Sequence, residues 1–156
     1  MKVLKGFVLV LIAATLALTV SACGGSDKAS TPEDSVVPFE KTSGAVVNLT
    51  KENSKASVDV KVAAGEALVI MSKIDSDSAN EIVATTFKDG AEYCTDSFYG
   101  GYGYSEGEVD PGDYRVDIDA GGETGTMWVI AYPANAIDVA NMETEDIINT
   151  VVSNIS

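Results

Sequence analysis

Oxygen-bearing side chains gather in one short loop of this sequence, where they could bind a cation. Asp75, Asp77, Asn80 and Glu81 stand within seven residues, between two apolar runs. Carboxylate and amide oxygens are the hard ligands that calcium prefers. The loop is not an EF-hand, because the invariant glycine and the glutamate at the twelfth position are absent. Acidic turns are also common without a metal, so we predict either a calcium site or an ordinary turn, and no other cofactor.

A second pattern, Gly103-Tyr104-Ser105-Glu106-Gly107, matches the G-x-S-x-G motif of a serine nucleophile. That motif needs a strand-to-helix turn and a histidine base. The chain contains no histidine, which excludes Ser-His-Asp and Cys-His catalysis and the usual zinc sites. Asp117 and Asp119 project from one face of a predicted strand and could form the acid pair of a hydrolase. A solvated acidic face is the alternative, and we predict a protein without enzymatic activity.

Aromatic residues concentrate in one glycine-rich segment. Five of them lie within twelve residues: Tyr93, Phe98, Tyr99, Tyr102 and Tyr104. Tyrosine gives contact area at low entropy cost and keeps a polar tip, so exposed rings here could stack on sugars or peptides. The alternative is an irregular strand whose rings fill one end of a core. These five side chains are the predicted ligand-binding residues.

The amino-terminal residues have the layout of a secretory signal. Lys2 and Lys5 precede the uncharged apolar run Phe7–Val20, which ends in small residues. A basic start, an apolar stretch of roughly 7–15 residues and a small-residue cleavage zone are typical of such signals. A membrane-spanning helix needs about 18 or more apolar residues. Residues 1–22 are therefore predicted to be a signal peptide.

Val20-Ser21-Ala22-Cys23 resembles the lipobox of bacterial lipoprotein precursors. The resemblance implies cleavage before Cys23 and acylation of its sulfur with fatty chains such as palmitate. Two or three chains anchor a protein firmly, because each buried CH₂ contributes about 0.8 kcal/mol. A secreted protein cut by another peptidase, with Cys23 as a free thiol, is the alternative. We expect a protein that is lipid-anchored to the cell membrane on its extracytoplasmic side.

The rest of the chain is strongly acidic. Without residues 1–22, 134 residues remain, with 8 basic and 24 acidic side chains and a net charge of −16. This length suits one domain, and the charge opposes binding to nucleic acid or flat attachment to anionic lipid. The predicted partners are the membrane through Cys23, and a glycan, peptide or envelope protein. Because acylation of Cys23 leaves Cys94 without a disulfide partner, we predict Cys94 to be a buried small side chain.

The hydrophobic pattern predicts a tether followed by strands. Residues 23–41 are rich in Gly, Ser, Asp and Thr and contain Pro32 and Pro38, which is typical of a flexible tether. Val58, Val60 and Val62 then alternate with polar residues, which indicates a strand with one buried face. Asp89-Gly90 is a strong hairpin signal. About seven or eight such strands predict an all-β, jelly-roll-like antiparallel β-sandwich over residues 42–133.

Two runs within that range are apolar at consecutive positions. They are Leu68–Met71 and Met127–Ala131, and Trp128 is predicted to be a core residue. Continuous apolar runs are typical of strands that are covered on both faces. We therefore expect both strands near the middle of a sheet.

Residues 134–156 are predicted to be a helical segment. Apolar residues recur there at helical spacing: Ile147, Ile148, Val151, Val152 and Ile155. Thr144 is the predicted N-cap, with acidic residues in the first turn. We expect this amphipathic helix to pack over an open end of the sandwich. A helix that is kept free for a partner is the alternative, since its apolar stripe would otherwise stay exposed.

Residues 58–70 and 110–118 resemble the pre-peptidase C-terminal type of bacterial β-sandwich. In such domains a strand, a Gly turn and an apolar strand come first, and a Pro-Gly-x-Tyr strand comes near the end. The resemblance implies a non-catalytic accessory domain, of a kind that in some proteins binds calcium or polymeric substrates. The sequence thus predicts a membrane-anchored binding or interaction module of the cell envelope. A structural or stress-related envelope protein and a calcium-dependent binding module are the alternatives.

Overall fold

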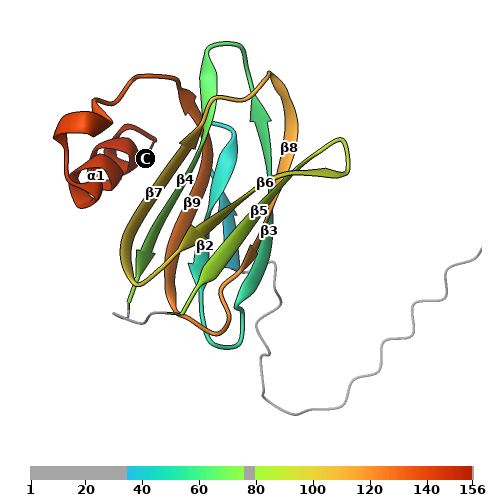
Figure 1. Ribbon diagram of the computed structural model, residues 1–156, viewed down its shortest axis with the longest axis vertical. Coiled ribbons are helices and arrows are strands. Elements are labelled where there is room, and N and C mark those ends of the chain that lie inside the picture. Colours follow the sequence, from blue (N-terminus) through green and yellow to red (C-terminus); the bar gives the residue numbers. More distant parts are fainter. Residues whose placement is uncertain (1–34, 76–79, 156) are drawn as a thin grey trace, which may run out of the picture.

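A computed structural model describes residues 35–75 and 80–155, which form two packed β-sheets and a carboxy-terminal helix (Figure 1). The strands are β1 Val36–Pro38, β2 Gly44–Leu49, β3 Lys55–Val62, β4 Glu66–Ile74, β5 Ile82–Lys88, β6 Ala91–Phe98, β7 Gly101–Gly107, β8 Gly112–Asp119 and β9 Gly125–Pro133. A short 3₁₀ helix, η2 Val139–Asn141, and the helix α1 Thr144–Ile155 follow. The predicted signal peptide, Cys23 and Asp77 lie outside the described residues.

The strand order is that of a jelly roll. Sheet A has the order β1-β2-β9-β4-β7 and sheet B the order β3-β8-β5-β6, with every pair antiparallel. Strands β2 to β9 supply four strands to each sheet, and β1 extends the edge of sheet A. The predicted antiparallel, jelly-roll-like sandwich with one terminal helix is therefore confirmed.

The main core lies between the two sheets and follows the predicted alternation. Tyr114, Val116 and Ile118 of β8 point inward and are at most 3% exposed, whereas the residues between them face outward. The hairpin between β5 and β6 turns at Asp89 and Gly90, whose φ angles of 52° and 79° are both positive. A two-residue turn of this kind needs such angles because it must match the twist of its strands.

A second core fills the space between sheet A and α1. The inward residues of β4 belong to the main core, while Ala67, Val69 and Met71 pack against the helix. The helix contributes its apolar stripe to this cluster: Ile147, Ile148, Val151 and Ile155. The prediction that the apolar strands are covered on both faces is confirmed. Trp128 borders this second core and is only half-buried.

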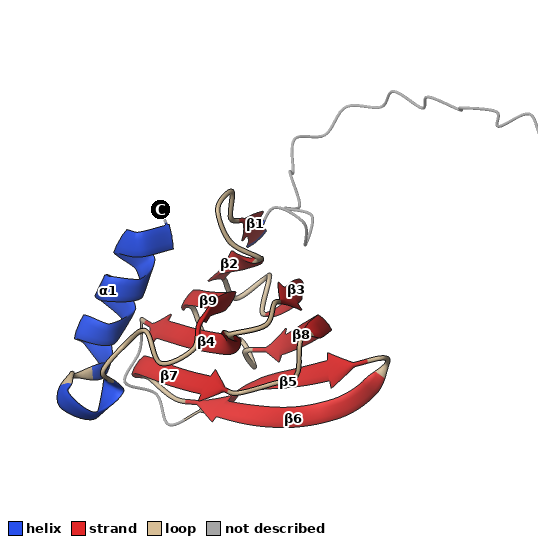
Figure 2. Cartoon of the chain, turned by 90° about the horizontal axis from the view of Figure 1, so that it is seen from above, coloured by secondary structure: helices blue, strands red, loops and turns tan. Residues whose placement is uncertain are grey.

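The helix takes a different position from the expected one. It covers the outer face of sheet A and not an open end of the sandwich (Figure 2). Thr144 is the first helical residue, and the carbonyl of Glu143 accepts the hydrogen bond from the Ile147 N–H, which places the N-cap one residue earlier. No helix among the described residues is long and apolar enough to cross a membrane.

The predicted tether reaches too far into the domain. Its end contains β1, which pairs with β2 through Val36, Val37 and Pro38. The two β-branched valines favour a strand. Pro38 is tolerated because β1 is an edge strand, where the missing N–H leaves no ladder bond unmade.

The prediction of a buried Cys94 is wrong. The thiol lies on β6 and is exposed, with its Sγ 4.0 Å from Asp96 Oδ2. β6 is the edge strand of sheet B, and its residues 91–95 are all exposed because this part projects beyond the packed sheets (Figure 1). An edge strand alternates its side chains like any other strand, but no described segment faces this part of β6 and buries them.

Candidate functional site

Among the described residues, no helix covers the outer face of sheet B, whereas α1 covers that of sheet A (Figure 2). Its outward positions on β3 and β8 form four cross-strand pairs: Lys55 with Asp119, Ser57 with Asp117, Asp59 with Arg115, and Lys61 with Asp113. Each pair joins opposite charges or a hydroxyl and a carboxylate, which are favourable directly opposite each other in an antiparallel pair. This face thus carries a row of complementary polar side-chain pairs, which we call the polar ladder.

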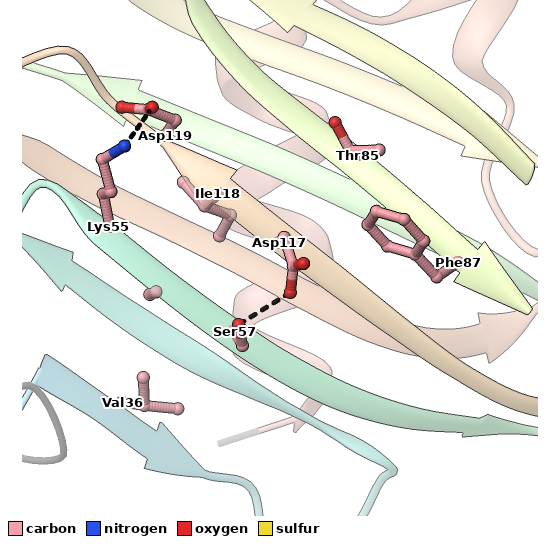
Figure 3. A pocket seen from close by; sticks show the side chains of 9 residues that line it. Val36, Lys55, Ser57, Thr85, Phe87, Asp117, Ile118 and Asp119 are labelled. Atoms are coloured by element: carbon pink, nitrogen blue, oxygen red, sulfur yellow. Dashed lines mark hydrogen bonds and ion pairs between the residues drawn. The ribbon is translucent and has the colours of Figure 1, made fainter. Parts of the chain in front are cut away.

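Three contacts fix the carboxylates of Asp117 and Asp119, and Figure 3 shows two of them, those from Ser57 and Lys55. Lys55 Nζ lies 2.8 Å from Asp119 Oδ2, and Ser57 Oγ donates to Asp117 Oδ1 at 2.7 Å. Arg115 Nε lies 3.0 Å from the same Asp117 oxygen. The hydrogen bond from Lys55 and another from the Gly121 N–H hold the pKa of the Asp119 carboxyl below its usual value. A general acid needs a raised pKa, so this aspartate is poorly suited to donate a proton near neutral pH.

β5 borders β8 on the other side and adds an apolar and a hydroxyl group. Thr85 lies opposite Asp117, and Phe87 lies opposite Arg115. The ring of Phe87 is 4.6 Å from the Arg115 guanidinium, at a distance typical of a cation–π contact. The register of β5 against β6 shifts between Thr86 and Phe87. Such bulges re-aim side chains.

Two hollows meet on this face at Phe87. The first has a volume of about 930 Å³ and is lined by Lys55, Ser57, Thr85, Phe87, Asp117 and Asp119, together with the apolar Val36, Ala56 and Ile118 (Figure 3). The second, of about 600 Å³, is lined on the same strands by Asp59, Lys61, Phe87, Asp113 and Arg115. Because they share Phe87 and occupy successive stretches of β3 and β8, we describe them together as the trough. Each volume lies within the range of about 300–1,000 Å³ that is usual for ligand sites.

The trough offers both hydrogen-bond acceptors and donors. Asp117 Oδ2 and Thr85 Oγ1 have no hydrogen-bond partner within residues 35–75 and 80–155. Lys55 Nζ is paired with Asp119, but its side chain remains 75% exposed. A carboxylate oxygen accepts, an ammonium donates, and a hydroxyl does both. This set of groups can bind a polar, uncharged ligand.

The predicted aromatic site is divided between different surroundings. Phe98 is 4% exposed in the main core. Tyr104 packs in the cluster under α1 and donates its hydroxyl to Glu106 Oε2 at 2.8 Å. Burial, followed by that hydrogen bond, raises the pKa of the Tyr104 hydroxyl. These two rings are structural parts of the two cores.

Tyr102 of sheet A forms a hydrogen bond with the helix α1. Its hydroxyl donates to Glu145 Oε1 at 2.8 Å in the first turn of α1, and Lys73 Nζ lies 5.7 Å from its ring. At the other end of the helix, Asn154 Nδ2 donates to the Tyr132 hydroxyl at 3.0 Å. Tyr102 therefore contributes to the attachment of α1.

The remaining predicted rings lie apart from each other. Tyr93 makes an edge-on contact with the Tyr114 ring at 5.8 Å. Tyr99 is 53% exposed in the β6–β7 turn. A hollow of about 320 Å³ touches Phe98, Tyr99, Tyr102 and Tyr104, but not Tyr93. The structure thus brings four of the five rings around one small hollow, and only Tyr99 and Tyr102 are exposed there.

The predicted calcium ligands are partly described. Asp75 and Glu81 are exposed, Asn80 Nδ2 donates to Glu123 Oε1, and Ser97 Oγ donates to Glu81 Oε1. Within the described ranges, no group of three or more acidic, His or Cys side chains could hold a metal ion. Since Asp77 lies outside these ranges, calcium at this loop stays a prediction.

Ser105 is not placed as a nucleophile. It lies within β7, opposite Ile70 of β4, and its Oγ donates to Asp96 Oδ1 at 2.7 Å. A nucleophile elbow needs the serine on a tight turn between a strand and a helix. The G-x-S-x-G match is therefore a coincidence of a glycine-rich strand.

Sequence reasoning missed Thr85 and Phe87 as candidate site residues. The available signal was the charge pattern. When β3 and β8 are aligned antiparallel, the charged outward residues of β3 lie opposite residues of opposite charge on β8. That match identifies β3 and β8 as neighbours. It does not identify β5 as the next strand, because the outward Val83, Thr85 and Phe87 are uncharged.

The chain matches no model of a known protein family and no curated protein. Among solved structures, it is similar to a mutant of Bacillus subtilis oxalate decarboxylase, with a TM-score of 0.25 and 13% identity over 78% of this chain and 39% of that one. The formate complex of Lactobacillus farciminis oxalate decarboxylase gives a TM-score of 0.24 and 13% identity, over 78% of this chain and 44% of that one. The chain spans less than half the length of either enzyme.

Proposed function

We propose that this protein is a lipid-anchored binding module of the cell envelope, without enzymatic activity, and that it binds its ligand in the trough of sheet B. The location rests on the sequence, where Val20–Cys23 follows a signal-like apolar run. The binding role rests on one observation above all. A sheet face with two adjoining hollows is left open, while the opposite face of the sandwich is covered by a helix.

The interaction role through α1 is the weaker candidate. Four apolar residues of the helix are at most 6% exposed: Ile147, Ile148, Val151 and Ile155. A helix that docks a partner needs its apolar stripe accessible, whereas this one is already occupied by sheet A. In an acid-pair hydrolase, Asp119 would not suit the role of general acid, because its pKa is held below the usual value.

Metabolic labelling with a palmitate analogue tests the anchor. The full-length chain should incorporate the label and sediment with membranes, and the Cys23→Ser variant should do neither. Thr31→Ser, a conservative change in the predicted tether, is the matched control and should behave as the wild type. Equal labelling of the wild type and Cys23→Ser would overturn the proposed location.

Co-sedimentation of the detergent-extracted chain with purified insoluble envelope material tests the binding face. Thr85→Lys places bulk and charge in the first hollow and should abolish co-sedimentation. Tyr99→Ala changes an exposed ring outside the trough and should leave it intact. Co-sedimentation that survives Thr85→Lys, or that is lost with Tyr99→Ala, would remove the trough from this role.

A further inference from the structure

We propose that the ligand of the trough is a neutral, extended polyhydroxylated chain, that is, a glycan without charged groups. This inference rests on the proposed function and specifies its ligand. Three properties of the trough support it: its charge, the hydrogen bonds of its backbone and the chemistry of its side chains.

The charge of the trough opposes the binding of polyanions. Among the residues that line the two hollows, five are acidic and three are basic. The chain after residue 22 has a net charge of −16, so the field of the whole domain also repels an anion. The basic side chains are largely engaged, since Lys55 pairs with Asp119 and Arg115 with Asp117. A ligand that carries many carboxylates, sulfates or phosphates would meet uncompensated acids here.

The backbone of β8, in the middle of the trough, is not available to a peptide, whereas β3 is an edge strand that pairs with β8 alone among the described strands. β8 pairs with β3 along one side and with β5 along the other, so its N–H and C=O groups are used in the two ladders. An extended peptide usually gains affinity by adding a strand to an open sheet edge, where main-chain groups are free. On this face a peptide would lose water from its own amides without regaining main-chain hydrogen bonds, and unmade hydrogen bonds are costly.

The side chains suit hydroxyl groups instead. A hydroxyl donates one hydrogen bond and accepts others, which matches a surface where acceptors and donors alternate. Asp117 Oδ2 can accept from a ligand hydroxyl, Lys55 Nζ can donate to one, and Thr85 Oγ1 can do either. Hydrogen bonds to charged groups such as these are stronger than neutral ones.

Phe87 supplies the apolar contact in the middle of the trough. It lines both hollows, so one ring can lie against successive units of a chain. Its stack with Arg115 and the nearby bulge hold the ring in place without using its whole surface, since Phe87 is half-buried. Eight residues of β8 span roughly 25 Å at about 3.3 Å per residue, which is long enough for several sugar units. A linear oligomer therefore fits better than a single small molecule.

Isothermal titration of the detergent-extracted full-length chain with cellohexaose, chitohexaose and mannohexaose tests the inference. At least one of these neutral hexasaccharides should bind, and Phe87→Ala should weaken that binding by about tenfold or more, as expected for a central contact. Asp117→Asn keeps the shape of the side chain and should weaken binding severalfold. Tyr99→Ala, outside the trough, should bind within about twofold of the wild type, and thermal melting of each variant confirms that it is folded.

Three results would overturn the glycan inference. One is that none of the three hexasaccharides binds at millimolar concentration. Another is that Phe87→Ala and Asp117→Asn, both folded, bind as the wild type does. The last is that oligogalacturonate or an extended peptide library binds in the trough in preference to the neutral sugars. None of these affects palmitate labelling or the Thr85→Lys co-sedimentation result, so failure of the glycan inference is distinguishable from failure of the proposed function.

Discussion

The outer faces of the two sheets have opposite side-chain chemistry. On β4 of sheet A the outward residues include Ala67, Val69 and Met71, and α1 covers these three. On β8 of sheet B the outward residues include Arg115, Asp117 and Asp119, and no helix within residues 35–75 and 80–155 covers them. Both strands are central and pair on both sides. The composition of alternate positions therefore decides which face gains a covering layer and which remains available to a ligand.

The largest expected effect is on the covered face. Ile148→Ala should lower the free energy of unfolding by about 2–4 kcal/mol, because a 2% exposed side chain leaves a cavity in the second core. Thr150→Ala, at an exposed position of the same helix, should change it by less than about 0.5 kcal/mol. Urea denaturation measures both. If the two variants were equally stable, α1 would not be an integral part of the fold.

The next largest expected effect on stability comes from filling the close contact at Gly103 of β7, the edge strand of sheet A beside β4. A Cβ at Gly103 would lie 2.5 Å from Ser72 Oγ and 2.6 Å from Phe98 Cδ1. Gly103→Ala should therefore lower the free energy of unfolding by about 1–3 kcal/mol, as measured by urea denaturation. Adding Ser72→Ala should restore part of the loss, since Ser72 Oγ is buried without a hydrogen-bond partner among the described residues. No recovery in the double variant would contradict the contact.

Truncating a side chain on the open face of sheet B should cost less stability than truncating one under α1. Ser57→Ala removes an exposed hydrogen bond to Asp117 and should change the free energy of unfolding by less than about 1 kcal/mol. Chemical denaturation beside Ile148→Ala makes the comparison direct. A loss as large as that of Ile148→Ala would mean that the polar ladder stabilises the fold, and the contrast between the faces would disappear.

The smallest effect concerns the protonation of Asp119. Its pKa is held below the ordinary value of 3.8, chiefly by the hydrogen bond from Lys55. A lowered pKa in the folded state stabilises the protein above pH 3.8, and this contribution is lost as the pH falls through the folded value. Lys55→Met should raise the Asp119 pKa toward 3.8, as followed by NMR of the carboxyl carbon. Lys51→Met, an exposed lysine outside the trough, should leave it unchanged.

The sequence was sufficient for the fold because burial is periodic. Val58, Val60 and Val62 alternate with polar residues, as in a strand with one face exposed to solvent. Leu68–Met71 is apolar at every position, as in a strand that is buried on both faces. Cys94 was misjudged because alternation does not say whether an edge strand projects beyond the facing sheet. β1 was missed because three residues are too few to show a period.

The candidate site was harder to predict because its residues are distant in sequence. Ser57 and Asp117 touch across sixty positions, and only the order of strands in sheet B adds Thr85 and Phe87 to them. Aromatic clustering drew attention to Tyr102 and Tyr104 instead. Their rings belong to the covered face, where their hydroxyls bond to Glu145 and Glu106.

Hydroxyl-radical footprinting of the full-length chain, in intact cells and after detergent extraction, tests the contrast between the faces most directly. Phe87 in the trough is half-buried, Tyr99 in the β6–β7 turn is exposed, and Ile148 under α1 is a buried reference. We predict that Phe87 is protected in cells and labelled after extraction, while Tyr99 is labelled in both and Ile148 in neither. Equal labelling of Phe87 in the two preparations, or protection of Tyr99 alone, would contradict the assignment of sheet B as the binding face.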